Sequence, residues 1–254
     1  MESLQVATLN LRNLADRWDE RLPLLLADMA ALQPDLIGLQ ECVYPLQQDR
    51  LLGTAGAGHY RAIRGWAGRP EYGNSILVRE PLMGGAPERV DLGRDRSAHR
   101  IGLDLNNGTR LTFAVTHLHH LVPDAAVRDE QTAALLAWLD GSSSHATIVV
   151  GDFNADPDEP AYARMRAAGF RSAYFEANGS EPAVTWPSGL QGPAIDDDGE
   201  PGCLDYIWLR GAVRVMSARL VFDRPAAEDP SLYPSDHFGV AARVELGEGG
   251  SDGG

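Results

Sequence analysis

The chain has 254 residues and a formal net charge of −14, with a pI near 4.8, which disfavours a protein that grips long nucleic acid, because phosphate binding relies on an excess of Lys and Arg. Hydrophobic residues make up 44% and charged residues 23% of the chain, and these near-average values suggest neither a disordered nor a fibrous protein. We expect one domain over residues 1–246, a flexible tail over 247–254, and a monomer.

The two cysteines, Cys42 and Cys203, lie far apart and have no metal-type spacing, so we expect two free, buried thiols. No signal peptide is visible after Met1, and no apolar run approaches the roughly 20 residues of a membrane-spanning helix. The sequence therefore favours a cytoplasmic protein with no transmembrane segment, although a chain trimmed of a secretion leader would look the same.

The first third predicts a strand, a helix and a second strand. Residues 4–10 are a short β-type run, residues 19–32 carry apolar side chains at helical spacing, and residues 36–40 are a buried strand. Glu41 follows that second strand directly. This order of elements places the carboxylate at one edge of a sheet, where ligands commonly bind.

The middle third predicts consecutive strands, which cover residues 60–64, 75–79, 102–105 and 110–116. Asn106-Asn107-Gly108 predicts a hairpin with a tight primed turn, because Asn and Gly accept positive φ angles. An amphipathic helix over residues 124–139 and a buried strand over 147–150 follow. The motif Gly151-Asp152-Phe153-Asn154 follows that strand directly.

The final third contains a long irregular segment over residues 178–203, which is rich in Pro, Gly and Asp and follows a short helix around 160–168. Loops of this length in compact domains are usually functional or mobile. Strands over 204–209, 213–222 and 239–246 complete the pattern.

Acidic, amide and imidazole residues follow several of these strands. Hydrolysis of a phosphate ester needs an aimed water, neutralised equatorial oxygens and a stabilised leaving oxygen. Mg²⁺ or Mn²⁺ supplies much of this and prefers carboxylate, amide and water oxygens. The oxygen-rich residues are Glu41, Asp152, Asp205 and Asp236, with the amides Asn10 and Asn154. Zinc is less favoured, because the chain has no His-rich metal spacing.

Each motif also has a plainer explanation. Residues 151–154 could form a simple turn, Ser235-Asp236-His237 could cap a helix, and His117 could be a core imidazole. Several such residues at the ends of apolar β runs are hard to obtain by chance. The joint pattern predicts a metal-dependent hydrolase.

Seven motifs, which together span nearly the whole chain, resemble the endonuclease/exonuclease/phosphatase superfamily. They are Thr8-Leu9-Asn10, Leu39-Gln40-Glu41, Tyr72-Gly73-Asn74-Ser75, Thr116-His117-Leu118, Gly151-Asp152-Phe153-Asn154, Leu204-Asp205-Tyr206-Ile207 and Ser235-Asp236-His237. The resemblance implies an α+β fold, a four-layer α/β/β/α sandwich of two mostly antiparallel sheets packed face to face with helices outside. It also implies a metal-dependent phosphodiesterase, phosphatase or nuclease.

The resemblance assigns a metal side and a phosphate side. Glu41 matches the principal metal-binding glutamate, and Asp236 matches a further acidic metal position. Asn10 matches the asparagine beside that glutamate, which supports the metal or the phosphate. Asp152 and Asn154 match the pair that positions the attacking water and contacts the phosphate. These assignments imply Mg²⁺ or Mn²⁺ as the cofactor.

Two histidines complete the implied site. His237 matches a general base or phosphate ligand that is oriented by Asp205. His117 matches a second histidine that contacts the phosphate or assists the leaving group, and it argues against a close relation to the abasic-site endonucleases. Asn74 is a candidate phosphate contact, with a strand-entry turn as the alternative, and Glu71 is a candidate partner of His117.

The substrate stays open. The low pI favours a small phosphodiester or phosphomonoester, and the alternative is a nuclease acting on short or single-stranded nucleic acid, with Trp66, Trp186 or Tyr233 as stacking platforms. A non-catalytic binding protein is disfavoured, because every matched position is filled.

Other charged residues each have two candidate roles. Arg94, Arg96 and Arg100 form the densest basic cluster, which could be a solvated face. The remaining candidates are His119 and His120 beside the cleft or on the surface, and Arg128 toward the site or a structural carboxylate. The run Asp196-Asp197-Asp198-Gly199-Glu200 is a candidate calcium site or a solvated loop.

Overall fold

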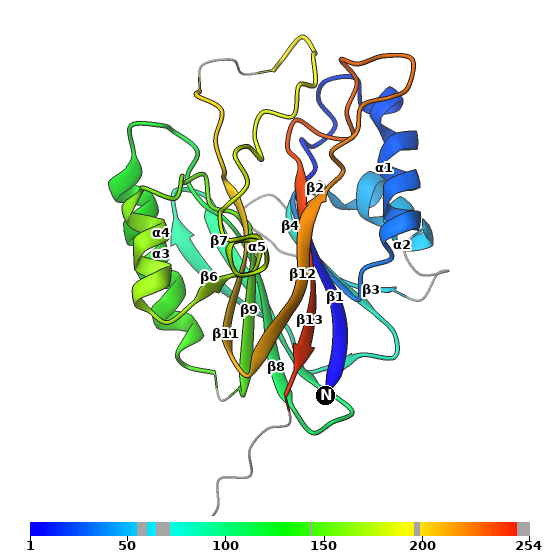
Figure 1. The fold of residues 1–254 in the computed structure, drawn as a ribbon. Coiled ribbons are helices and arrows are strands. Elements are labelled where there is room, and N and C mark those ends of the chain that lie inside the picture. The colour runs from blue at the N-terminus through cyan, green and yellow to red at the C-terminus, as the bar shows by residue number, and fades with distance from the viewer. Residues whose placement is uncertain (55–59, 65–71, 143, 196–198, 248–254) are drawn as a thin grey trace, which may run out of the picture.

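The computed structural model describes the chain except residues 55–59, 65–71, 143, 196–198 and 248–254. Two sheets pack face to face, and helices cover their outer sides (Figure 1). The predicted four-layer α/β/β/α sandwich is therefore confirmed. In the described part of the chain, no helix has the length and apolar character needed to cross a membrane.

The first sheet has the strand order β12-β13-β1-β2-β4-β3, with β1 and β2 parallel and the other neighbours antiparallel. The helix α1 (Trp18–Leu32) packs Leu25 and Met29 against its outer face. After β2 come a short π-helix (Tyr44–Gln48) and α2 (Asp49–Thr54), which the sequence did not predict. The strands are β1 (Glu2–Asn10), β2 (Leu36–Val43), β3 (Tyr60–Arg64), β4 (Tyr72–Arg79), β12 (Val213–Val221) and β13 (Gly239–Leu246).

The second sheet has the order β10-β11-β9-β8-β7-β5, and β6 also pairs with β7. Here β8 and β9 are parallel and the other neighbours antiparallel. Its outer face is covered by α3 (Ala125–Leu139) and α4 (Pro160–Ala167), and α5 (Ala173–Asn178) follows β10. The strands are β5 (Met83–Gly84), β6 (Glu88–Gly93), β7 (Arg96–Asp104), β8 (Arg110–His117), β9 (Ala146–Asp152), β10 (Arg171–Ser172) and β11 (Asp205–Gly211).

Side chains that alternate along each strand separate the inner core from the outer layers. In β1, Leu4 and Val6 enter the core between the sheets, while Ala7 and Leu9 face α1. At Gly38 in β2 an added Cβ would lie 2.4 Å from Val150 Cγ2 on the facing sheet. Only glycine therefore allows the sheets this spacing at that point.

Some local predictions were incomplete. The strand expected at 102–105 begins at Arg96, and β6 was missed, because the charged run over 88–100 reads as a loop until it pairs in the sheet. The hairpin between β7 and β8 is confirmed, but the tight primed turn is wrong: residues 105–109 form the loop, and only Gly108 has a positive φ there.

The two cysteines are free and buried, as expected. Cys42 packs in the layer beside α1, and Cys203 packs in the layer beside α3 and α4. They lie on opposite outer sides of the sandwich and do not form a disulfide.

Candidate active site

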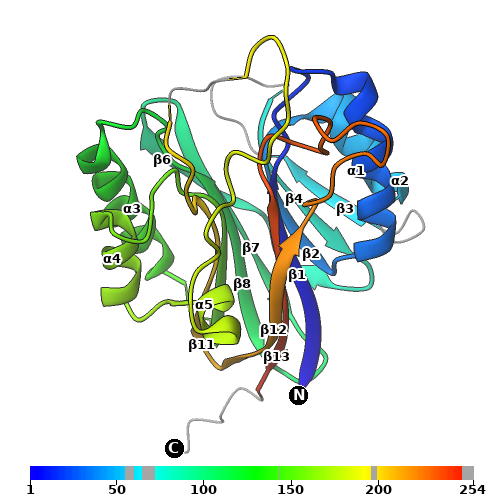
Figure 2. The same ribbon diagram turned by 45° about the horizontal axis from the view of Figure 1, so that its top comes forward.

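A cleft of about 1040 Å³ opens at the end of the sandwich where β1, β2, β8 and β9 finish and β4, β11 and β13 begin. In Figure 2 this end lies at the top of the molecule. The predicted site residues that line it are Asn10, Glu41, Asn74, His117, Asp152, Asn154, Asp236 and His237. Asp205 is buried behind His237 and does not line the cleft.

Strand alternation explains why most of these side chains converge. Five of the site residues lie an even number of positions along their strand from side chains of the inner core, so they face the same side of the sheet. They are Asn10, Asn74, His117, Asp152 and Asp205. Each is the polar continuation of an inward-facing row. At this end of both sheets the inward-facing side chains therefore change from apolar to polar.

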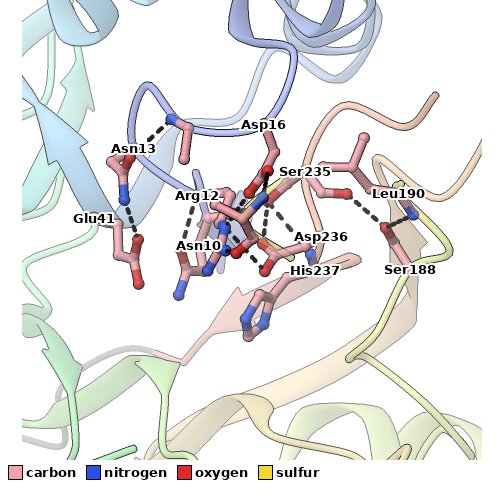
Figure 3. Close-up of polar contacts among 12 residues, drawn as sticks. Asn10, Arg12, Asn13, Asp16, Glu41, Ser188, Leu190, Ser235, Asp236 and His237 are labelled. Atoms are coloured by element: carbon pink, nitrogen blue, oxygen red, sulfur yellow. Dashed lines mark hydrogen bonds and ion pairs between the residues drawn. The ribbon is translucent and has the colours of Figure 1, made fainter. Parts of the chain in front are cut away.

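Glu41 does not follow this alternation, and a β-bulge redirects it. The pairing of β2 with β4 shifts by one residue between Leu39 and Cys42, and Glu41 has a left-handed backbone with φ 52°. Bulges commonly re-aim a side chain beside a functional site. The bulge brings Glu41 into the cleft, where Oε2 accepts a hydrogen bond of 2.9 Å from Asn13 Nδ2 (Figure 3).

Gly151 fixes the start of the Gly-Asp-Phe-Asn motif. Its φ is +149°, and an added Cβ would lie 2.0 Å from the carbonyl oxygen of Thr116 on β8. The motif is thus a tightly paired strand end, which the plain turn explanation did not anticipate. Asn154 donates its backbone N–H to Asp152 Oδ1 at 2.9 Å and its side-chain amide to the Leu118 carbonyl at 3.1 Å.

Asp152 is the centre of the polar network. Its Oδ2 accepts a hydrogen bond from Asn10 Nδ2 at 3.0 Å and lies 3.4 Å from His117 Nε2 and 3.8 Å from His237 Nε2. Burial and the nearby Asp205 charge raise the pKa of Asp152, against the opposing effect of His237. A carboxylate in this position binds a proton at higher pH than an exposed aspartate does.

His237 is held between carboxylates. Its Nδ1 is 2.9 Å from Asp205 Oδ2, so Nε2 faces Asp152 and the cleft. Burial alone would lower the pKa of His237, but Asp205, Asp152 and Asp236 outweigh it and raise the pKa. The imidazolium form is therefore favoured, with both ring nitrogens as donors.

His117 has the opposite electrostatic character. Burial, followed by the positive charges of Arg96, His237 and His120, lowers the pKa of His117 well below its ordinary value. The ring is therefore neutral at neutral pH. The two histidines of the site differ in charge although both are buried.

The metal side gathers hard oxygen atoms. Glu41, Asp236 and the amide of Asn10 border the same part of the cleft as Arg12 and Asn13 (Figure 3). Arg12 Nε lies 3.6 Å from Asp236 Oδ2 and 3.0 Å from Asp16 Oδ2. Carboxylate and amide oxygens fit Mg²⁺ or Mn²⁺ better than zinc.

A second group also has ligand atoms at metal-type spacing: one atom each of Asp152, Asp205 and His237 lie within 4.8 Å of one another. Because His237 Nδ1 is already bonded to Asp205 and Asp152 is bonded to Asn10, we interpret this group as a proton-holding network. That Glu41, Asp236 and Asn10 bind the metal stays a prediction.

The other candidates separate clearly. Asn74 lies inside β4, so the turn alternative is wrong, and its amide donates to the Ser97 carbonyl at 2.9 Å. Trp186 lines the cleft, whereas Tyr233 packs against Phe238 with ring centroids 5.9 Å apart and does not line it. Trp66, Glu71 and Asp196–Asp198 lie outside the described residues.

The basic residues and the neighbouring histidines have different partners. Arg100 bonds Glu88 and the Trp138 carbonyl, while Arg94 and Arg96 line the cleft. The surface interpretation of His119 is wrong: the ring is buried, 2.8 Å from Asp124. His120 is exposed. Arg128 bonds the structural carboxylate of Glu159 at 2.9 Å.

The sequence analysis did not identify the cleft residues Arg12 and Asn13, or the buried Arg21 that holds their loop. Arg12 and Asn13 reach the metal side from the loop after β1, and that loop is organised by the fully buried Arg21. The guanidinium of Arg21 donates to the carbonyls of Leu11, Arg12, Asn13, Ala15, Asp16 and Pro234. An arginine at helical spacing gives no sequence signal of such a role.

Comparison with curated proteins finds relatives along most of the chain. Nocturnin of Xenopus laevis is 29% identical over 265 residues, covering 91% of this chain and 66% of that protein. Human Nocturnin is also 29% identical and covers the same share of this chain, but only 59% of its own length is matched. The chain thus spans about three fifths to two thirds of these relatives.

Solved structures share the fold. D. rerio TDP2 complexed with single strand DNA product has a TM-score of 0.80 at 18% identity, covering 97% of this chain and 100% of that chain. The human Nocturnin catalytic domain with bound sulfate anion has a TM-score of 0.76 at 23% identity, covering 96% and 95%. The model of the Endonuclease/Exonuclease/phosphatase family matches residues 7–237. The chain therefore belongs to the endonuclease/exonuclease/phosphatase family.

Proposed function

We propose that the protein is a divalent-metal-dependent hydrolase of phosphate esters, acting by in-line attack of water on phosphorus. The observation that carries the proposal is the convergence of Asn10, His117 and His237 on Asp152 Oδ2, in the same cleft as Glu41 and Asp236. Family membership and the Nocturnin and TDP2 relatives support this reaction class.

The residues present fit a bound Mg²⁺ or Mn²⁺. Glu41 and Asp236 supply carboxylates and Asn10 an amide in the cleft, and Arg12 Nε lies 3.6 Å from Asp236 Oδ2. When bound, such a cation neutralises charge on the phosphate oxygens and stabilises the leaving oxygen. We assign this side of the cleft to the metal.

Asp152 is suited to receive the proton of the attacking water. Its raised pKa brings its proton affinity closer to neutral pH, which favours a general base. Asn154 and Asn10 fix the orientation of the carboxylate through hydrogen bonds to Oδ1 and Oδ2. As the new P–O bond forms, the proton passes to Asp152 and the leaving oxygen departs with the electron pair of the broken bond.

The two histidines bind the phosphate in different ways. His237, kept protonated by Asp205, donates a charged hydrogen bond from Nε2 to a phosphate oxygen. Neutral His117 donates or accepts without adding a charge. Of the two roles implied for His237, phosphate ligand and general base, the electrostatics therefore favour the phosphate ligand.

The described part of the long segment between α5 and β11 supports a substrate of limited size, because it is bonded to loops on the other side of the cleft. Arg12 donates to the Ala194 carbonyl, and Ala194 N–H donates to Asp16 Oδ1 at 2.7 Å, so Ala194 is bonded to the loop that follows β1. Ser188 N–H bonds the Asp236 carbonyl at 2.7 Å. Together with the net charge of −14, a bridged cleft favours a small phosphodiester or phosphomonoester, or the end of a short single strand, over continuous duplex.

The test is a metal-restored activity screen. Protein stripped with a chelator is assayed with Mg²⁺ or Mn²⁺ on an aryl phosphodiester, an aryl phosphomonoester, a single-stranded oligonucleotide and plasmid DNA. We expect activity on small esters or strand ends that requires metal and is lost in Asp152→Asn. Activity that survives chelation, or full activity of Asp152→Asn, would contradict the mechanism, and cleavage of plasmid alone would contradict the substrate preference.

A further inference from the structure

Arg96 begins β7 at the lip of the cleft, immediately after the turn that joins β6 to β7. Gly93, Arg94 and Asp95 in that turn all have positive φ angles, and the Gly93 carbonyl accepts a hydrogen bond of 3.1 Å from Gln131 Nε2 on α3. The turn is therefore fastened to the helix layer. The hydrogen bond from α3 to this turn therefore holds the backbone next to Arg96 in place beside the cleft.

Arg96 differs from the other arginines of the cleft in its partners. Arg12 lies 3.0 Å from Asp16, Arg94 lies 3.4 Å from Asp124, and Arg128 lies 2.8 Å from Glu159. For Arg96, no carboxylate among the described residues lies within ion-pair distance, although Asp95 also lines the cleft. The guanidinium of Arg96 therefore has no ion-pair partner in the part of the chain that the structure describes.

The contact with His120 orients the guanidinium. Arg96 Nη2 lies 2.9 Å from His120 Nδ1, and because a guanidinium only donates, Nδ1 must be the acceptor. This bond leaves most of the five N–H donors of Arg96 for another acceptor. A planar donor fork of this kind matches the oxygens of a phosphate.

The position of Arg96 relative to His117 separates it from the reacting centre. Ala98 of β7 pairs with Thr116 of β8, so Arg96 lies two residues beyond the last pair, whereas His117 lies one residue beyond it. Burial is the main cause of the lowered pKa of His117, and the charge of Arg96 is the second. The same charge acts on Tyr72, which also lines the cleft, and opposes the rise in its pKa. Arg96 therefore lies farther out along the cleft than the residues assigned to the cleaved phosphate.

We propose that Arg96, with His120 beside it, binds a second phosphate-type oxyanion of the substrate, distinct from the phosphate that is hydrolysed. This inference rests on the proposed function, because it requires a phosphoester at Asp152 and His237. The second oxyanion belongs either to a small molecule with two phosphates or to the neighbouring phosphate of a short strand. Both present the same chemistry to Arg96.

The experiment compares matched substrates in Arg96→Gln and Arg94→Gln. One pair is a nucleoside monophosphate and the corresponding bisphosphate, and the other is a dinucleotide with and without a terminal phosphate. Arg94→Gln is the matched control, since it removes the same charge two residues away, in the turn before β7, at a residue that is already paired with Asp124. Binding of inorganic diphosphate and orthophosphate to the metal-free proteins is measured by calorimetry.

We expect Arg96→Gln to lower the ratio of kcat/KM for the doubly charged substrate over its partner by about 10-fold or more, the scale of a lost charge-assisted hydrogen bond. Diphosphate binding should weaken similarly, and Arg94→Gln should leave the ratio within about 2-fold. The substrate pair that shows the loss identifies the source of the oxyanion.

Two outcomes overturn the inference. An equal loss on both members of each pair would make Arg96 a ligand of the cleaved phosphate, and an unchanged ratio with unchanged diphosphate binding would make it a solvated surface residue. If wild-type protein hydrolyses no phosphoester yet binds diphosphate through Arg96, the proposed function fails while the oxyanion site stands.

Discussion

Replacing Arg21 with Met removes the donor group that organises the loop carrying Arg12 and Asn13. Arg21 is fully buried, and burial lowers its pKa to about 10. Its strongest hydrogen bonds go to the carbonyls of Ala15 at 2.7 Å, Asp16 at 2.8 Å, Pro234 at 2.9 Å and Leu11 at 3.1 Å. At about 1 kcal/mol for each bond, the loss amounts to about 4 kcal/mol of unfolding free energy.

Met keeps most of the side-chain volume, so the effect isolates the lost donors from the creation of a cavity. Urea unfolding followed by circular dichroism measures the change, and Arg219→Met, at an exposed position, is the control with an expected change within about 0.5 kcal/mol. The variant should also lose more activity than its unfolded fraction explains, because the loop holds the Asn13 contact to Glu41. A destabilisation below about 1 kcal/mol would refute this reasoning.

Three further predictions concern the site and the core. Asp152→Asn and Asp205→Asn should each lower kcat by about 100-fold or more, because one removes the base and the other the charge that holds His237 protonated; near wild-type turnover of either variant would contradict these roles. Gly151→Ala should destabilise the strand end and misplace Asp152, since its Cβ would lie 2.0 Å from the Thr116 carbonyl oxygen; unchanged thermal unfolding would argue against this contact. Buried His99 has a pKa lowered to about 4, mainly by burial, so the unfolded chain, with a pKa near 6.5, binds the proton first as pH falls. Stability should drop by up to about 3 kcal/mol between pH 6.5 and 4, and His99→Gln should flatten that slope in unfolding curves; an unchanged slope would rule out His99 as the cause.

The fold class was predictable because two kinds of signal agree along the chain. The apolar runs of β1, β9 and β13 are strands by periodicity and length, and α1 and α3 have apolar residues at helical spacing. The elements that were missed, such as β6 and the first half of β7, contain charged residues such as Arg89, Asp91 and Arg96. They become strands only through pairing, which local sequence does not encode.

The sequence by itself determined which polar residues end which strands, and motif order linked Glu41, Asp152 and His237 to one family. Tertiary structure alone decided how they meet. The bulge that turns Glu41 inward, the different charge states of His117 and His237, and the burial of Arg21 against backbone carbonyls all depend on atoms far apart in the chain. Burial and electrostatic fields are sums over those distant neighbours, so no local pattern of residues could specify them.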